Sequence, residues 1–208
     1  MNIHSAIGGG EVEAALSKKD HILKAALHLF AERGYDATTV PSIAETAGVG
    51  AGTIYRYFDN KETLVNHLFQ HCISRLADIW KANDGLNEFK TRDQFHRLFY
   101  GMVSYSEEEE YALHFLRDHA YAHFLDEESL KAFDETLGIL RDFFEEGQKK
   151  EDIKKLPSDG LIAILFGAFL ELQKMVWSGH LILSPKLLAD LEESLWDAVR
   201  INKGSLTI

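Results

Sequence analysis

The stretch of sequence that decides the fold reads TTVPSIAETAGVGAGTIYRYF and covers residues 38–58. Apolar residues recur at helical spacing over residues 40–47 and again over 51–57, and a GVG triplet separates the two runs. Thr39 is a suitable N-cap, and Pro41 falls in the first turn, where a missing N–H does no harm. The pattern predicts two short helices joined by a tight turn, which is the helix-turn-helix arrangement.

The sequence on either side predicts two further helices that complete this unit. Ser17 is a suitable N-cap for a helix that presents apolar residues on one side, and Gly34 is a suitable stop for it. On the other side, Asp59 or Asn60 caps a helix that we expect to reach Trp80.

The remaining chain also shows helical spacing, so we expect an all-α protein of about nine helices. We expect a flexible tail over residues 1–16, a three-helix domain over 17–62 and a larger helical domain over 63–208. The later helices are expected near residues 91–105, 107–124, 127–148, 157–178 and 184–200.

Composition sets limits on location and partners. The single cysteine, Cys72, cannot form an internal disulfide, so nothing indicates an oxidising compartment. No signal peptide or long apolar span is visible, so we expect a cytoplasmic protein that does not associate with a membrane. The net charge of −11 argues against nucleic acid, but residues 18–62 carry six basic and six acidic side chains. This segment is therefore neutral and can present a local basic face on an acidic body.

Many positions at fixed spacing in this region resemble one known family. They include ILKAA at 22–26, LFAERGY at 29–35, TTV at 38–40 and GTIYRYF at 52–58, followed by Lys61. Together they closely resemble the DNA-binding domain of TetR-type regulators over about residues 18–69. The resemblance implies a homodimer that binds a palindromic operator in double-stranded DNA and is released by a small-molecule effector, with no cofactor. It leaves open an activating or metal-responsive regulator.

The second helix of such a pair reads base edges in the major groove near its N-terminus. A glycine there lets the helix approach the duplex closely, and phenol, guanidinium and ammonium groups commonly contact phosphates. The resemblance assigns backbone contacts to the positions of Tyr55, Tyr57 and Lys61. Few side chains remain for base readout, so DNA shape is expected to contribute to specificity. The full expected set of DNA-binding residues is Thr39, Gly50, Ala51, Gly52, Thr53, Tyr55, Arg56, Tyr57 and Lys61.

Aromatic residues are frequent between residues 90 and 125, and such stripes serve more often as core than as pockets. The resemblance places an effector cavity among these helices, suited to an apolar or aromatic ligand. The expected ligand-binding residues are Phe99, Met102, Val103, Phe115, His119, His123 and Phe143. Two histidine pairs at four-residue spacing, 67/71 and 119/123, are compatible with a metal, but no further ligands complete a set, so no metal site is expected.

The last two predicted helices carry apolar or small side chains along one face, which suits pairing of two subunits in a four-helix bundle. The expected dimer interface comprises Ala163, Phe166, Gly167, Leu170, Leu188, Leu191 and Leu195.

Two other classes of protein compete with this interpretation. For an enzyme, the sequence lacks a nucleophile elbow, a phosphate loop, a zinc signature and a dinucleotide fingerprint. A helical carrier of a metal or small ligand would need no DNA contact. The helix-turn-helix match discriminates against both classes.

Overall fold

The computed structural model describes residues 17–82 and 90–202. The expected tail over residues 1–16 lies outside the described residues. The described part contains helices and one isolated β-bridge between Ile153 and Arg200. The helices are α1 (Lys18–Ala37), α2 (Val40–Thr46), α3 (Ala51–Ile54), α4 (Lys61–Lys81), α5 (Thr91–Glu108), α6 (Ala112–His119), α7 (Glu127–Lys149), α8 (Ser158–Ile162), η2 (Ala163–Gly167), α9 (Ala168–Trp177) and α10 (Pro185–Val199). Since α8, the π-helical turn η2 and α9 follow one another without a break, the described residues form nine helices, which confirms the expected all-α class.

Helix starts follow the capping chemistry that the sequence predicts. Ser17 and Asp20 form a reciprocal capping box, in which the Ser17 amide donates to Asp20 Oδ2 at 2.9 Å and the Asp20 amide donates to Ser17 Oγ at 3.2 Å. Thr39 forms a second capping box with Ser42 at α2, while the side chains of Asn60 and Ser184 accept a backbone N–H at the starts of α4 and α10. The helical path of α1 is interrupted at Gly34, whose φ of +75° favours glycine.

Two predicted helices were wrong in length. The helix expected over residues 107–124 is shorter at both ends, because α5 continues to Glu108 and α6 covers only Ala112–His119. Four consecutive glutamates at 107–110 repel one another on a helix, and the backbone leaves helical geometry at Glu109 (φ −127°, ψ 74°). The helix expected over residues 51–57 stops at Ile54, and a turn continues to Tyr57.

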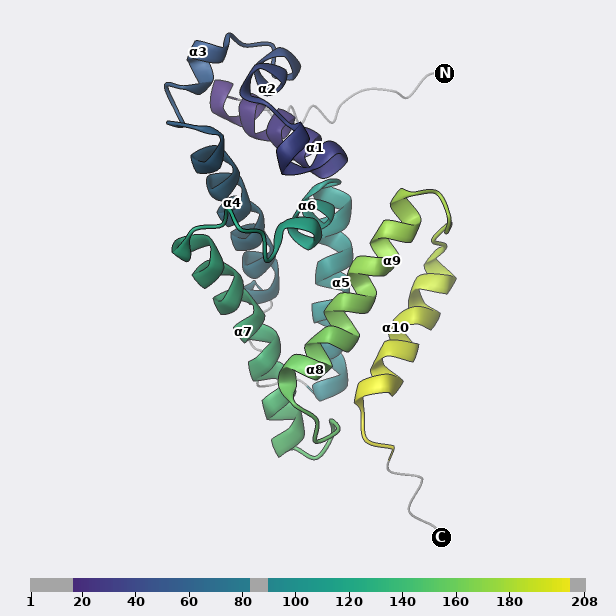
Figure 1. Ribbon diagram of the computed structural model, residues 1–208. Coiled ribbons are helices and arrows are strands. Elements are labelled where there is room, and N and C mark those ends of the chain that lie inside the picture. The colour runs from purple at the N-terminus through teal and green to yellow at the C-terminus, as the bar shows by residue number, and fades with distance from the viewer. Residues whose placement is uncertain (1–16, 83–89, 203–208) are drawn as a thin grey trace, which may run out of the picture.

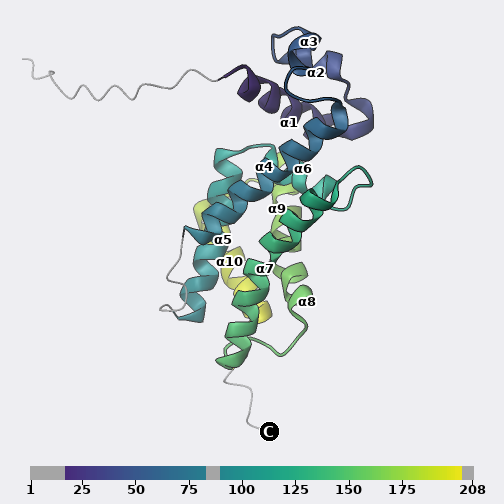
Figure 2. The same cartoon turned by 90° about the vertical axis from the view of Figure 1, so that its left-hand side faces the viewer.

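The helices form a head and a body (Figure 1). Helices α1, α2 and α3 form the head at one end, and α4 runs from the head along the body, as the turned view in Figure 2 also shows. In the body α4 packs along α7 and α5, while α6 contacts α1 on one side and α9 on another. Helix α6 is therefore the element that joins the head to the C-terminal helices.

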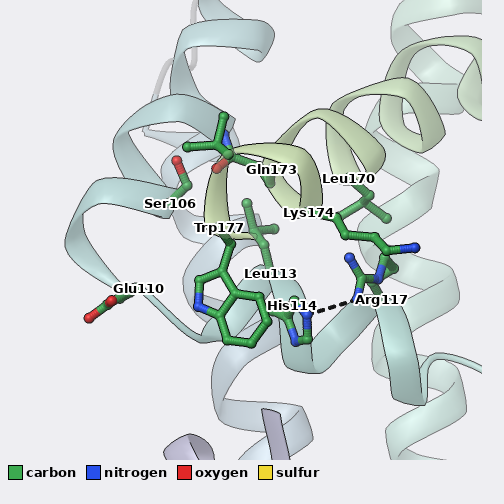
Figure 3. A pocket seen from close by; sticks show the side chains of 10 residues that line it. Ser106, Glu110, Leu113, His114, Arg117, Leu170, Gln173, Lys174 and Trp177 are labelled. Carbon is green, nitrogen blue, oxygen red and sulfur yellow. Dashed lines mark hydrogen bonds between the residues drawn. The ribbon is translucent and has the colours of Figure 1, made fainter. Parts of the chain in front are cut away.

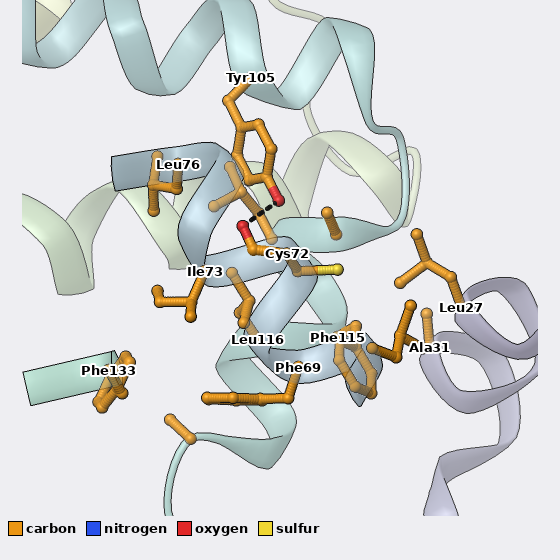
Figure 4. Packing of buried hydrophobic residues seen from close by; sticks show 14 of the residues in the cluster. Leu27, Ala31, Phe69, Cys72, Ile73, Leu76, Tyr105, Phe115, Leu116 and Phe133 are labelled. Carbon is orange, nitrogen blue, oxygen red and sulfur yellow. Dashed lines mark hydrogen bonds between the residues drawn. The ribbon is translucent and has the colours of Figure 1, made fainter. Parts of the chain in front are cut away.

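Head and body share one hydrophobic core (Figure 4). Leu27 and Ala31 of α1 lie beside Phe115 of α6 and Phe69 of α4. Because these residues are buried together, a shift of α6 alters the packing of α1. The buried Cys72 behaves as a small apolar residue, and burial raises the pKa of its thiol to about 12.

An ion pair fixes α10 against α5. Arg92 Nη2 donates to Glu192 Oε2 at 2.7 Å and to Glu193 Oε2 at 2.8 Å. The side chain of Glu192 is only 5% exposed, and its hydrogen bond raises the pKa of Arg92. Trp196 lies under the Arg92 guanidinium at 5.7 Å and is itself buried. These contacts hold the inner side of α10 and leave its other side facing outward.

The continuous segment Ser158–Trp177 is, among the described residues, the one helix long and apolar enough to cross a membrane by length and composition alone. Core helices pass the same test. Here Leu161, Leu165 and Phe169 are fully buried in the body, so packing explains these apolar positions, while only 33% of the apolar window is buried.

Candidate nucleic-acid interface and ligand pockets

The α2–α3 pair has the geometry of a helix-turn-helix. Gly48 takes a φ of +64° in the turn, and the Val49 amide donates to the Ala44 carbonyl at 2.9 Å. Ile43 and Ile54 are buried between the helices. The turn therefore fixes how α3 projects from the head, at the outer end seen in Figure 1.

The start of α3 is bare and open to solvent. Gly50 is its N-cap and offers no side chain to the free amides of the first turn. A Cβ added at Gly50 or Gly52 would meet no other atom of the chain within 4 Å. Internal packing therefore does not require glycine at either position, whereas the close approach of an external surface would.

Polar aromatic and cationic groups surround this bare start. Tyr55 and Tyr57 are 54% and 47% exposed, which is high for tyrosine. Arg56 is also exposed and forms no ion pair within the part of the chain that the structure describes. Thr39 is exposed at the N-cap of α2, while Ala51 and Thr53 are half-buried. Thr39 thus precedes α2, and the other residues lie on α3 or on the turn that follows it, in the head.

Phe58 is part of the core rather than of the exposed surface. It is 4% exposed, its ring lies 5.4 Å from that of His67 in α4, and the Lys19 ammonium lies 5.8 Å from its centroid. Phe58 thus clamps the α3 turn onto α1 and α4.

The Lys61 side chain is held by contacts within the chain. Its Nζ donates to the backbone carbonyls of Tyr35 at 2.9 Å and Thr38 at 3.1 Å. It also lies 3.8 Å from the centroid of the Tyr35 ring. Two of the three ammonium donors therefore fix the end of α1 to the start of α4, and one remains.

The residues expected to bind a ligand lie mostly in the packed core. Phe99, Met102 and Phe115 have no exposed surface, and Phe99 meets Phe169 edge-on at 5.5 Å. Val103, His119 and Phe143 are also buried, whereas His123 is exposed. None of the seven lines either of the two pockets described next.

One pocket of about 390 Å³ lies between α6, α7 and the segment from α8 to α9. Its walls are mainly apolar, with Arg117, Arg141 and Asp159 among them. Four of the residues expected at the dimer interface line it, namely Ala163, Phe166, Gly167 and Leu170. We call this space the α7 pocket.

A second pocket of about 310 Å³ lies between the end of α5, α6 and α9, next to the head (Figure 3). We call it the α6–α9 pocket. Its polar walls include His114, Arg117 and Lys174, and its largest apolar side chain is Trp177. Sequence reasoning missed it because its residues come from three separate helices and form no local motif.

The predicted dimer residues divide between two environments. Ala163 and Gly167 are exposed, and Leu170, Leu188, Leu191 and Leu195 are half-buried. Phe166 instead points inward, where its ring lies 6.1 Å from that of Trp80. The outer side of α8–α9 thus presents small residues, and α10 presents a row of half-covered leucines.

The histidine pairs hold no recognisable metal site. No group of three or more His, Cys, Asp or Glu side chains with metal-binding geometry occurs among the described residues. Burial lowers the pKa of His67 and of His119, and the His119 ring bonds the Phe115 carbonyl through Nδ1 at 2.8 Å.

Comparison with known proteins places this architecture in a class. Residues 22–68 match the family of bacterial regulatory proteins named tetR, and residues 69–201 match the tetracyclin repressor-like C-terminal domain. The chain therefore belongs to the TetR family of transcriptional regulators, which are not enzymes.

Individual relatives share mainly the N-terminal part. The chain is 28% identical over 107 residues to the uncharacterized HTH-type regulator YhgD of Bacillus subtilis, covering 51% of this chain and 55% of YhgD. It is 32% identical over 78 residues to IcaR, a negative regulator of the biofilm operon icaADBC in Staphylococcus epidermidis. That match covers 34% of this chain and 42% of IcaR. The matches thus span about half, or less, of these relatives.

Solved structures resemble nearly the whole chain. A TetR family regulator from Marinobacter aquaeolei has a TM-score of 0.73 at 22% identity, covering 89% of this chain and 96% of that one. The fatty acid degradation regulator FadR of Bacillus halodurans has a TM-score of 0.66 at 24% identity, covering 90% and 99%. The ketosteroid transcriptional regulator KstR2 of Mycobacterium tuberculosis has a TM-score of 0.72 at 18% identity, covering 89% of this chain and 96% of that one. At these identities the likeness shows the fold alone.

Proposed function

We propose that this chain is a transcriptional repressor that binds a palindromic operator as a homodimer and leaves it when a small apolar or aromatic effector binds the body. The observation that carries the proposal is the bare, glycine-flanked start of α3, surrounded by exposed Tyr55, Arg56 and Tyr57. A regulator of this kind acts in the cytoplasm.

In the proposed complex α3 lies in the major groove with Gly50 and Gly52 against the duplex. Thr53 and Ala51 face base edges, where a hydroxyl or methyl can meet thymine. Tyr55, Arg56, Tyr57 and the Thr39 hydroxyl donate to phosphates, as does the remaining Lys61 donor. This assignment gives many phosphate contacts and few base contacts, so binding is strongly salt-dependent and shape-dependent.

The proposed dimer pairs the outer sides of α8–α9 and α10 with their copies across a two-fold axis. Ala163 and Gly167 permit close approach of helices, and Leu188, Leu191 and Leu195 supply apolar surface. Because four of the expected interface residues line the α7 pocket, a partner subunit seated there covers that pocket. Two heads spaced one duplex turn apart, or a multiple, would match a palindrome.

Two structurally similar regulators, FadR and KstR2, support an apolar effector, since their names refer to fatty acid degradation and to a ketosteroid. Repression is supported by IcaR, named a negative regulator, and by a Rhodococcus jostii KstR2, named a repressor. Six of the seven residues expected at the ligand are buried, so entry of an effector between Phe99, Phe115 and their neighbours requires the core to open.

The test is fluorescence anisotropy of the purified protein with a labelled duplex from the intergenic region upstream of its own gene, across a salt series. Specific binding that weakens steeply with salt, against a scrambled duplex as control, supports the proposal. Equal affinity for both duplexes at every salt concentration counts against an operator at that location.

A further inference from the structure

The α6–α9 pocket combines an exposed indole with free cationic donors. Trp177 is 46% exposed, whereas Trp80 and Trp196 are buried. A half-exposed indole leaves apolar area in water that a flat ligand would cover. Leu113, Leu170 and Val176 supply further apolar wall in the same pocket. The pocket volume, about 310 Å³, lies within the range of small-molecule sites.

The ring of His114 already stacks against this indole. The two ring centroids are 4.4 Å apart with an interplanar angle of 39°. His114 is much less exposed than Trp177, with 13% of its side chain accessible. Trp177 therefore has a partner ring on its inner side and accessible surface toward the pocket (Figure 3).

Two cations stand on the same side of the pocket. In Figure 3 the Arg117 and Lys174 side chains lie beside one another, and the carboxylate of Glu110 points away from the indole. Lys174 has one acidic neighbour, Glu171 at 3.6 Å, and both side chains are more than half exposed. Such a pair is weak and leaves the ammonium available to another anion.

Arg117 also retains donors. Its Nε donates to Asp118 Oδ1 at 2.7 Å, and its Nη2 donates to His114 Nε2 at 2.9 Å. A guanidinium has five N–H groups, so three remain for a ligand. The fork geometry of those groups suits a carboxylate.

The Arg117 bond also fixes the tautomer of His114. Since a guanidinium only donates, His114 Nε2 accepts, and the proton of the neutral ring sits on Nδ1. That Nδ1 is buried and has no hydrogen-bond partner, and the nearest carboxylate oxygen, Asp118 Oδ2, is 3.6 Å away. Burial and then the nearby Arg117 charge lower the pKa of His114, against opposing effects from the Asp118 carboxylate and the Ala31 backbone of α1. His114 is thus an unsatisfied donor at the junction of α6 with the head.

We propose that the α6–α9 pocket binds a planar aromatic carboxylate, whose ring stacks on Trp177 and whose carboxylate lies between Arg117 and Lys174. This inference rests on the proposed function and names the effector class. The carboxylate draws Arg117 away from His114 Nε2. The freed imidazole then rotates so that its buried Nδ1–H reaches an acceptor, which changes the contact of α6 with α1.

The path from pocket to head is short. Tyr111, the N-cap of α6, meets His28 of α1 edge-on at 4.9 Å, and Phe115 of α6 lies 6.1 Å from Phe30 of α1. Since α1 is fixed to α4 through Lys61, a shift of α1 reorients the head as a unit. A ligand lowers operator affinity only as far as it prefers the shifted state.

Isothermal titration calorimetry with 2-naphthoate tests the site without any DNA. We expect saturable binding, with naphthalene-2-carboxamide and octanoate each at least about tenfold weaker because they lack the charge or the ring. Trp177→Leu is expected to weaken 2-naphthoate binding about tenfold or more, and Lys174→Gln about threefold or more. Met175→Leu, which changes an exposed apolar residue on the same helix outside the pocket, is the matched control. Labelling with 5-fluorotryptophan and recording ¹⁹F NMR spectra places the ligand, since the Trp177 resonance should shift most.

Several outcomes would overturn the inference. They are no binding of 2-naphthoate at millimolar concentration by a folded protein, equal affinity for the neutral amide, or unchanged affinity in Trp177→Leu. Anisotropy with an operator duplex then separates the two proposals. Naphthoate binding by a protein that binds no DNA supports this site and contradicts the repressor. Operator binding without any naphthoate response at saturating ligand contradicts the inference alone.

Discussion

The Lys61 ammonium lies 3.8 Å from the centroid of the Tyr35 ring and donates to the Tyr35 carbonyl at 2.9 Å, so the first residue of α4 closes the end of α1. Tyr35 in turn stacks on Phe124 at 4.0 Å, beyond the end of α6. The start of α4, the end of α1 and the segment after α6 thus meet at Tyr35.

Replacement of Lys61 by methionine removes two charge-assisted hydrogen bonds and the contact with the Tyr35 ring. We expect the free energy of unfolding to fall by about 1–3 kcal/mol, measured by urea denaturation. Lys24→Met, at an exposed position of α1, should change stability little. If Lys61 also contacts a phosphate, the slope of log affinity against log salt concentration becomes shallower by about one, since one fewer counterion is released on binding. An unchanged unfolding free energy would contradict the structural role.

Gly52→Ala separates DNA contact from folding. The added Cβ meets nothing within 4 Å inside the chain, so the melting temperature should not fall. Operator affinity should drop about tenfold or more, because the methyl group stands between α3 and the duplex. Gly138→Ala in α7, which also has free space, is the control and should leave DNA binding intact. Full operator affinity in Gly52→Ala would show that α3 does not approach the duplex at this position.

Tyr57→Phe removes one exposed phenol hydroxyl and keeps the ring. We expect DNA affinity to weaken about three- to tenfold for specific and scrambled duplexes alike, since phosphate contacts carry no sequence information. Thermal stability should be unchanged, as the side chain is 47% exposed. A selective loss for one duplex in the anisotropy series would reassign Tyr57 to base readout.

Stability should fall as the pH drops from about 7.5 to 5.5. Burial lowers the pKa of His67, His114 and His119 below the ordinary value of 6.5. The unfolded chain therefore takes up protons near pH 6.5 while the folded chain does not, so acid favours unfolding. Carboxylates with lowered pKa, such as Asp118, lose their contribution only at still lower pH.

Urea midpoints at the two pH values measure this effect. His119→Phe should reduce the difference between them, because one neutral buried histidine is removed. His123→Phe, at an exposed position, should leave the difference as it is. Equal midpoints at both pH values in the unmodified protein would contradict the predicted linkage.

The head was the part of the fold best predicted from sequence, for a physical reason. Its caps at Ser17, Thr39 and Asn60 and its turn at Gly48 are local chemistry, which a short window of sequence contains. The boundary between the helices expected over 91–105 and 107–124 was placed too early, because apolar spacing continues past residue 106 and only the run of like charges signals the end at Glu109.

The body's pockets could not be predicted in the same way. Aromatic residues such as Phe99 and Phe115 suggest a cavity by composition, but their burial depends on helices distant in the chain. The α6–α9 pocket joins residues 106–117 to residues 170–177, and neither segment carries a motif alone. Only the packing of α6 on α9 brings His114 to Trp177.

The central claim is that the head reads a palindromic operator, and selection from fragmented genomic DNA tests it wherever that operator lies. The protein is incubated with the fragments at moderate salt, bound DNA is sequenced, and a Gly52→Ala, Tyr57→Ala double variant is treated identically. We predict enrichment of fragments that share an inverted repeat with half-sites about one duplex turn apart, or a multiple, and loss of that enrichment in the variant. No shared sequence above the variant's background, from a folded dimeric protein, would contradict the account.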